Sequence, residues 1–259
     1  MGAHQKVDRI ARNHLERLVP ACSFPRKRTI LYFEGDKGPD AIKRKSPAKD
    51  EPWHYIQPFD NEDVGLIKII EGHYGLLVDA LRRNDDVRAA FEAAWLSHAI
   101  VDGLTPAHHY PYEEKLVELR NGEGIETRTT IKTKLLMPGE TRRNQLHNNW
   151  KMWGPKGLFT THAAFEWGFA TVVLPLRLRT ALPQPADIDN FTSQGVGEWF
   201  RRQAQEIATL GMYENFYKNG WTPKLARQIR RELAPAIVRS VTLVWYGALM
   251  EAKAAGPAQ

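Results

Sequence analysis

Histidine and carboxylate side chains recur at a spacing of four residues in two parts of the sequence. His98 is followed by Asp102, and His162 is followed by Glu166. On a helix, residues four apart lie on the same face, one turn apart. Each pair therefore presents one nitrogen and one oxygen to the same point, which is half of a metal site of the kind that zinc occupies.

The surroundings of the two pairs favour a metal site over a surface ion pair. A single pair of this type is more often a surface pair or a helix cap. Here, however, His98 follows Ala-Ala-Trp-Leu-Ser, and His162 precedes Ala-Ala-Phe-Glu-Trp-Gly-Phe-Ala. A carboxylate on such an apolar helix face is costly unless it is paired or bound to a metal. Beyond Asp102 the chain turns at Gly103-Leu-Thr-Pro-Ala and presents two further histidines, His108 and His109.

The composition restricts which ligands a metal could have. The chain has 259 residues, of which 42% are hydrophobic and 25% charged, and this is ordinary for a globular protein. Its one cysteine, Cys22, excludes an intramolecular disulfide framework and a thiolate zinc cluster. Any metal must therefore be held by histidines and carboxylates.

The elements that carry these residues are predicted to be helices, and the predicted fold class is all-α, a single-domain multi-helix bundle over residues 1–259. Apolar spacing and capping signals predict helices over 4–18, about 62–82, from 84–86 to Gly103, after Gly157, around 191–213, and from Thr222-Pro223 onward with a kink at Pro235. Only Thr29 to Phe33 and parts of 126–136 resemble strands.

The segment from about 120 to 157 is interpreted as a basic loop inserted into the domain. It carries eight basic and three acidic residues, and the whole chain has a formal charge of +6, which favours anionic partners. A loop of this length is usually functional or mobile. Most of the eight tryptophans are expected in the core. Trp150 and Trp153, in the insertion, are candidates for stacking on a base or covering a cationic head group, with core packing as the leading interpretation.

The order of these motifs resembles a known family. His98-x3-Asp102-x5-His108, followed by His162-x3-Glu166, is similar to the metal signature of zinc-dependent phospholipase C, which fungal single-strand-specific nucleases with a trinuclear zinc site share. Three weaker similarities precede it, namely Ala3-His4-Gln5, Gly38-Pro39-Asp40 and Trp53-His54-Tyr55. The resemblance runs from residue 4 to about residue 170 and implies the helical fold of that family.

The resemblance also implies a set of metal ligands for two or three zinc ions. One ion would be held by Asp40, His54, His98 and Asp102, a second by His108, His162 and Glu166, and a third by His4, a bridging Asp102 and the chain's N-terminus. Relatives use a processed N-terminal tryptophan at the third position. This chain begins Met-Gly-Ala, so a two-metal site is the alternative.

Two other histidines are alternative ligands. His14 lies about three turns after His4 and is expected on the surface of the first helix. His109 could replace its neighbour His108, although the family spacing favours His108.

The function that the resemblance implies is phosphodiester hydrolysis by a zinc-activated water. Asp40 or Asp102 would orient that water or take its proton, and Asp40 is the family's candidate. A phospholipid is the expected substrate, with contact to a membrane surface, and single-stranded nucleic acid is the alternative. A third interpretation is a non-catalytic helical protein with a structural metal site.

The sequence as written gives no sign of a membrane span or a secretion signal. The longest apolar stretch, 236–250, is shorter than the roughly 18 residues that a membrane helix requires, and it includes Arg239. The first residues contain no apolar run of signal-peptide type. We therefore expect a cytoplasmic protein, although relatives of the family are secreted.

Overall fold

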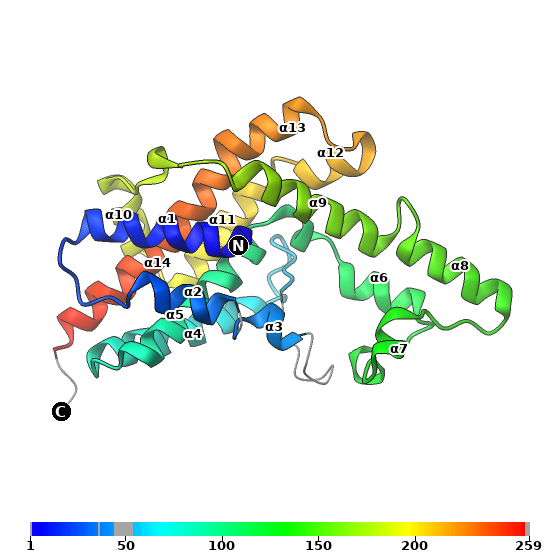
Figure 1. The fold of residues 1–259 in the computed structure, drawn as a ribbon, viewed down its shortest axis with the longest axis horizontal. Coiled ribbons are helices and arrows are strands. Elements are labelled where there is room, and N and C mark those ends of the chain that lie inside the picture. The colour runs from blue at the N-terminus through cyan, green and yellow to red at the C-terminus, as the bar shows by residue number, and fades with distance from the viewer. Residues whose placement is uncertain (1, 36, 44–53, 257–259) are drawn as a thin grey trace.

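The computed structural model describes residues 2–35, 37–43 and 54–256, and this part of the chain is helical throughout, with no strand (Figure 1). The all-α prediction is thereby confirmed. The α-helices are α1 (Ala3–Leu18), α2 (Lys27–Glu34), α3 (Pro39–Lys43), α4 (Gly65–Arg82), α5 (Asp86–Gly103), α6 (Tyr112–Leu119), α7 (Ile131–Leu135), α8 (Arg142–Trp153), α9 (Leu158–Val173), α10 (Pro185–Thr192), α11 (Val196–Ala208), α12 (Met212–Asn219), α13 (Pro223–Gln228) and α14 (Ala234–Ala254).

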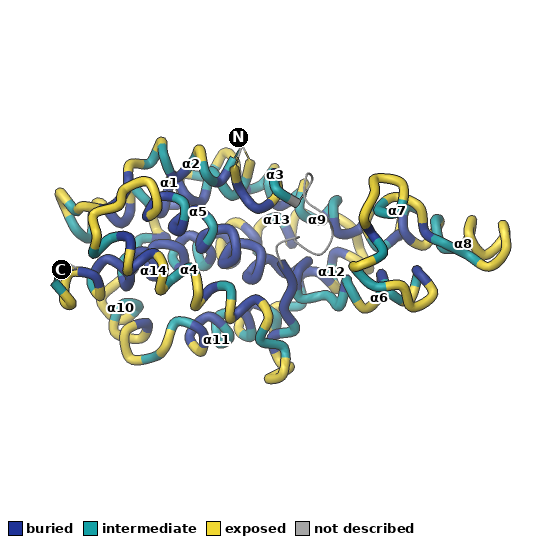
Figure 2. The backbone as a smooth tube through the Cα atoms, turned by 90° about the horizontal axis from the view of Figure 1, so that it is seen from below, coloured by how far each residue is buried: buried dark blue, intermediate teal, exposed yellow. Residues whose placement is uncertain are grey.

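Helix α5 is the central element of the main body. It packs against α1, α2, α4 and α14, and both α5 and α14 are buried along most of their length (Figure 2). Asp85 begins α5 by accepting a hydrogen bond from the backbone N–H of Arg88 at 2.9 Å. Small side chains allow the neighbouring helices to approach closely, and those of α5 that are fully buried include Ala89, Ala90, Ala93 and Ala94.

The C-terminal helices form the second long core element. Thr222 caps α13, and a π-helical turn at Ile229–Leu233 joins α13 to α14, with Pro235 in the first turn of α14. The predicted start at Thr222-Pro223 is thus confirmed. The continuous segment Pro223–Ala254 has a stretch with mean hydropathy 1.4, which by length and composition would suffice to cross a membrane, but 78% of that stretch is buried inside the protein. Its apolar character is explained by its place in the core.

Residues 112–157 form a lobe that projects from one end of the body (Figure 1). The lobe contains α6, α7 and α8 and shares a small hydrophobic core with Tyr55; its own buried members are Tyr112, Leu116, Met137 and Met152. Buried Arg120 donates a hydrogen bond to the carbonyl of Thr133 at 2.7 Å and so ties the lobe's turns together.

Three predictions about local structure were wrong. Thr29 to Phe33 lies in helix α2 rather than a strand, because packing of α2 against α5 outweighs the β-propensity of its residues. Part of 126–136 forms a short 3₁₀ turn at Ile125–Thr127 and the helix α7, which Thr130 caps. The insertion is therefore largely helical rather than a loop. The region around 191–213 contains α10, α11 and α12 instead of one helix.

Candidate metal centre

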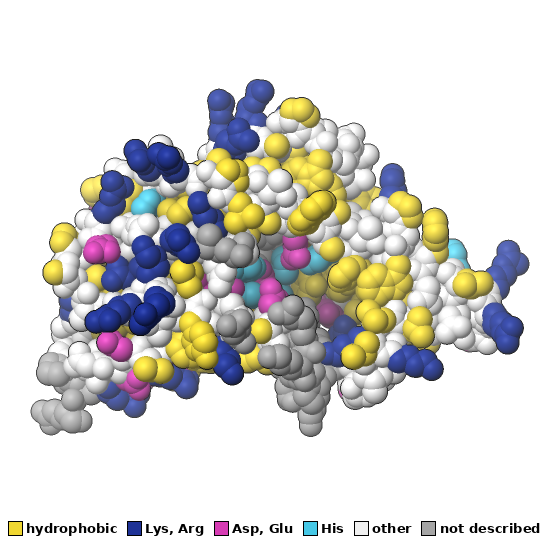
Figure 3. Space-filling model, viewed as in Figure 1, with side chains coloured by type: hydrophobic (Ala, Val, Ile, Leu, Met, Phe, Trp, Pro, Cys, Tyr) yellow, Lys and Arg dark blue, Asp and Glu magenta, His cyan; other side chains and the backbone are white. Residues whose placement is uncertain are grey.

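A cavity of about 730 Å³ lies between α5, α9 and the lobe. Its lining includes seven of the eight predicted ligands, namely His4, Asp40, His54, Asp102, His108, His162 and Glu166. The eighth, His98, is buried behind them and contacts Asp102. Figure 3 shows histidine and acidic side chains at the bottom of this hollow, with hydrophobic side chains beside them. Residues far apart in the sequence thus meet at one place.

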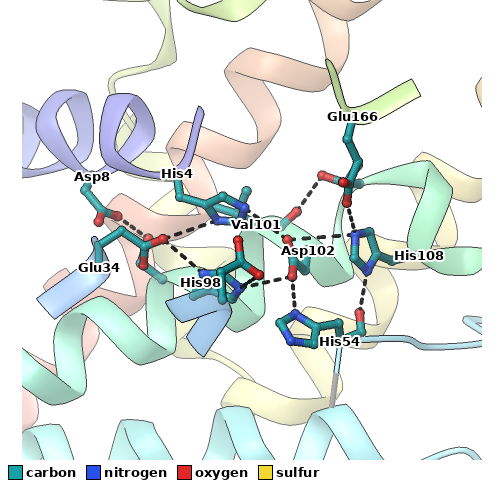
Figure 4. A network of polar contacts seen from close by, with 12 residues as sticks. His4, Asp8, Glu34, His54, His98, Val101, Asp102, His108 and Glu166 are labelled. Atoms are coloured by element: carbon teal, nitrogen blue, oxygen red, sulfur yellow. Dashed lines mark hydrogen bonds and ion pairs between the residues drawn. The ribbon is translucent and has the colours of Figure 1, made fainter. Parts of the chain in front are cut away.

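Asp102 is the centre of this group of residues, and four imidazoles surround its buried carboxylate (Figure 4). Oδ1 lies 3.2 Å from His4 Nε2 and 3.9 Å from His108 Nε2. Oδ2 lies 3.2 Å from His98 Nε2 and also contacts His54 Nδ1. The two oxygens of Asp102 therefore face different histidines, as a carboxylate that bridges two ions would.

The same contacts determine the charge of Asp102. Burial alone would raise its pKa, but the charges of His108, His98 and His4, together with the hydrogen bond from His54, hold the pKa well below its usual range. For His98, burial acts to lower the pKa, whereas Asp102 and Glu34 raise it well above the ordinary value. The electrostatics of the site thus favour an ionised Asp102 beside a protonated His98.

The first candidate ligand group contains residues from three separate segments of the chain. Oxygen and nitrogen atoms of Asp40, His54 and His98 all lie within 4.8 Å of one another. Asp40, at the start of α3, is the accessible member, with 64% of its side chain exposed, and its Oδ1 lies 3.9 Å from His98 Nε2. Asp40 therefore reaches the metal position from the solvent side.

The second candidate group consists of His108, His162 and Glu166. Glu166 Oε1 lies 2.8 Å from His108 Nε2 and 3.1 Å from His162 Nε2. Although burial would raise the pKa of Glu166, hydrogen bonds from the two histidines and their charges hold it far below the usual range. His108 Nδ1 lies 3.0 Å from the carbonyl oxygen of His54, which can only accept. Nδ1 therefore carries a proton, and Nε2 is the nitrogen that faces Glu166 and would face a metal held by this group.

Glu34, at the end of α2, was not predicted as a site residue. Its Oε1 lies 3.0 Å from His98 Nδ1 and 3.8 Å from His4 Nδ1, which makes a third group (Figure 4). The buried Asp8 lies nearby and accepts a hydrogen bond from Ser97. Burial and the charge of Glu34 raise the pKa of Asp8 well above its ordinary value. No local signal marks Glu34, because the residues before it resemble a strand rather than a helix.

The residues present fit a zinc ion. Zinc in proteins is bound by histidine nitrogen and carboxylate oxygen, and these are the donors in all three groups. Buried polar atoms are normally hydrogen-bonded, yet His98 Nε2, although 3.2 Å from Asp102 Oδ2, has no hydrogen bond of good geometry to any described residue. Such an atom is what a ligand set is expected to contain.

The alternative ligands lie elsewhere. His14 is not on the surface as expected: it is only 3% exposed, among apolar residues of α1, and it does not line the cavity. Burial lowers its pKa, and Arg17 adds to this effect. His109 Nε2 donates to the carbonyl of Gly103 at 2.8 Å, and burial lowers its pKa to about 4. The geometry thus favours His108 over His109.

Two parts of the predicted site lie outside the described residues, namely Met1, which would lead to the N-terminal ligand, and Trp53 of the Trp-His-Tyr motif. Most of the described tryptophans are buried or partly buried against a hydrophobic core, as expected: Trp95 packs against the main core and Trp153 against the core of the lobe. Trp199 and Trp245 are buried, but Trp150 is 68% exposed, and Trp153 lines the cavity.

The outer part of the cavity differs in character from its floor. The apolar side chains that line it include Leu116, Ile131, Leu135, Phe159 and Trp167. Two cationic residues, Arg128 and Lys134, lie among them. Arg128 forms an ion pair with Glu113 at 2.7 Å. The lobe and α9 therefore contribute an apolar wall with basic groups, and the candidate metal ligands form the floor.

The chain matches no described protein family, and a search of curated proteins found no similar sequence.

Proposed function

We propose that the protein is a zinc-dependent phosphodiester hydrolase of the phospholipase C type, holding two or three zinc ions. The observation that carries this proposal is the convergence of seven histidines and carboxylates on the floor of one cavity, around the shared Asp102. A structural zinc site is closed by its ligands, whereas a catalytic site keeps an open position. Ligands that line a cavity of about 730 Å³ support the catalytic alternative.

The chemistry follows from the ligand set. Bound zinc would polarise a phosphate oxygen and lower the pKa of a water molecule toward 7. Within the chain, the ionised Asp102 holds the imidazoles in place. Asp40 is the residue proposed to orient the attacking water and take its proton, because its carboxylate, with 64% of the side chain exposed, is the most accessible among the proposed ligands. Arg128 and Lys134 would attract the anionic substrate to the outer wall.

The outer wall favours a phospholipid as the substrate. Acyl chains need apolar contacts, and aliphatic side chains such as Leu116, Ile131 and Leu135 line the cavity beside the ligands. Contact of the lobe with a membrane surface belongs to the same proposal. A nuclease remains the second candidate because Trp167, at the cavity, is 79% exposed and could stack on a base.

The first test measures zinc and activity together. Untagged protein, purified without chelator, would be analysed for zinc and assayed with bis(p-nitrophenyl) phosphate, beside a His98→Ala/Glu166→Ala double variant. A matched control is His147→Ala, because His147 is exposed on α8. We expect two to three zinc ions per chain and hydrolysis in the wild type and control, and loss of both in the double variant. Less than half an equivalent of zinc, unchanged by added zinc, would refute the proposal.

A second test separates the substrates. The zinc-loaded protein would be offered phospholipid in mixed micelles and, separately, single-stranded DNA. If the phosphorylated head group is released faster than DNA is cleaved, the result supports the phospholipase. If only DNA is cleaved, the result supports the nuclease. A zinc-loaded protein that cleaves none of the three substrates would favour the structural-metal interpretation.

A further inference from the structure

The rings of His4 and His98 are stacked on each other at the centre of the site. Their centroids are 4.2 Å apart and their planes differ by 11°. Ring nitrogens bind metals within the plane of the ring, so two parallel stacked imidazoles do not aim at the same atom. His4 and His98 are therefore suited to two different ions, and Asp102 lies between those positions, with Oδ1 toward His4 and Oδ2 toward His98.

A second carboxylate lies on the opposite edge of the same two rings. The Nε2 atoms face Asp102, each at 3.2 Å, and the Nδ1 atoms face Glu34 Oε1, at 3.0 Å for His98 and 3.8 Å for His4. Figure 4 shows Glu34 and Asp102 on the two sides of the stacked pair. Glu34 is buried and is not part of the cavity lining. The stacked pair is thus held between a carboxylate at the cavity and one behind it.

We infer that Glu34 is a positioning residue for the stacked pair: its carboxylate accepts the Nδ1–H of His98 at 3.0 Å, faces Nδ1 of His4 at 3.8 Å, which is beyond hydrogen-bond distance, and leaves both Nε2 atoms for metal. This inference rests on the proposed metal centre. Histidine ligands commonly donate their second ring N–H to a carboxylate, which fixes the tautomer and makes the ligand nitrogen more basic. One carboxylate that faces both ligands couples the two metal positions from behind, as Asp102 couples them from the front.

The competing assignment makes Glu34 itself a ligand, together with the two Nδ1 atoms. The stacking opposes it, because one ion would have to lie in the planes of two parallel rings. The distance of 3.0 Å between Glu34 Oε1 and His98 Nδ1 is that of a direct hydrogen bond, which needs no ion between the atoms.

The experiment compares Glu34→Gln and Glu34→Ala with the wild type and with Glu62→Gln, a control at an exposed residue before α4. Zinc stoichiometry is measured at saturation, zinc affinity by competition with a chelator, and the histidine tautomers by ¹⁵N NMR. We expect both Glu34 variants to bind the full number of ions with affinity reduced 10- to 100-fold, and Glu62→Gln to be unchanged. In the zinc-loaded wild type, His98 should carry its proton on Nδ1.

The possible outcomes are distinct. Loss of a whole zinc equivalent at saturation in Glu34→Gln would make Glu34 a ligand and overturn the inference. A zinc affinity of Glu34→Gln within twofold of the wild-type affinity would also overturn the inference. In the zinc-loaded wild type, a His98 that carries its proton on Nε2 overturns the inference without any variant, even if the substitutions impair folding. A wild type that binds no zinc defeats the proposed function as well, whereas the other results leave that function standing.

Discussion

The main body and the lobe of residues 112–157 show two ways of building the wall of one cavity. In the body, the candidate ligands of α5 lie on a helix that is buried along most of its length and packs against α1, α2, α4 and α14. In the lobe, a small core supports cavity-lining side chains that are largely exposed, such as Ile131 and Leu135. The difference fits the proposed function, because metal ligands need a rigid, buried framework to hold them, whereas a wall for a variable apolar substrate does not. The predictions below test this contrast.

The largest effect is expected for Asp102→Ala in the body. Its removal leaves four imidazoles without their shared carboxylate, so both bridged metal positions lose a ligand. We expect at least one zinc equivalent to be lost and phosphodiester hydrolysis to fall by about 10³-fold or more. Elemental analysis and turnover of bis(p-nitrophenyl) phosphate measure both. Asp79→Ala, at an exposed position of α4, is the control, and equal effects of the two substitutions would contradict the central role of Asp102.

Cavity-forming substitutions test the contrast in packing. Leu96→Ala removes a fully buried side chain of α5 and should lower the free energy of unfolding of the whole protein by about 2–5 kcal/mol. Met137→Ala, in the small core of the lobe, should reduce global stability by only about 1 kcal/mol, because the lobe can open while the body stays folded. Denaturant unfolding measures the global free energy of unfolding of both variants. Hydrogen exchange should show faster opening of α6–α8 in Met137→Ala. Equal global losses would mean that the lobe unfolds only with the body.

Substitution of the cavity rim tests what the outer wall contributes. Trp167 is largely exposed, so Trp167→Ala should leave the melting temperature nearly unchanged. We expect KM for phospholipid micelles to rise several-fold, because an apolar contact with the substrate is lost, while kcat changes little. Steady-state kinetics on micelles checks this. A large fall in kcat with unchanged KM would assign Trp167 to the chemical step instead.

The smallest effect concerns pH and the buried His14. Burial lowers the pKa of His14 in the folded protein below its ordinary value of 6.5. The unfolded chain therefore binds this proton more readily, so the stability contribution is intact above pH 6.5 and is lost as the pH falls through the folded pKa. Arg17, which also disfavours the charged form, acts in the same direction. His14→Gln should make stability less dependent on pH below 6.5, as thermal melts across that range would show; an unchanged slope would contradict the assignment.

The parts of the site that could be predicted are those whose residues lie close together in the sequence. The pairs His98–Asp102 and His162–Glu166 each lie on one helix, so their spacing alone places them on one face. Glu34 could not be predicted, because the β-branched and aromatic residues before it resemble a strand and only packing against α5 makes them a helix. His14 was misjudged for a similar reason, since its burial depends on how α14 covers α1. The helices of the lobe have weak apolar spacing, and caps such as Thr130 and Thr141 define them instead.

Tyr55 belongs to both regions. Its ring stacks on Tyr112 of the lobe at 5.2 Å and on His108 of the metal centre at 5.1 Å, so three aromatic rings form a continuous column from the lobe to a ligand. Movement of α6 that tilts this column also turns the imidazole of His108. Metal affinity and the position of the lobe are then thermodynamically linked, and the linkage is reciprocal. Under the proposed function, an ion held by His108 would favour one position of the lobe, and a substrate that drew the lobe inward would increase the affinity for that ion.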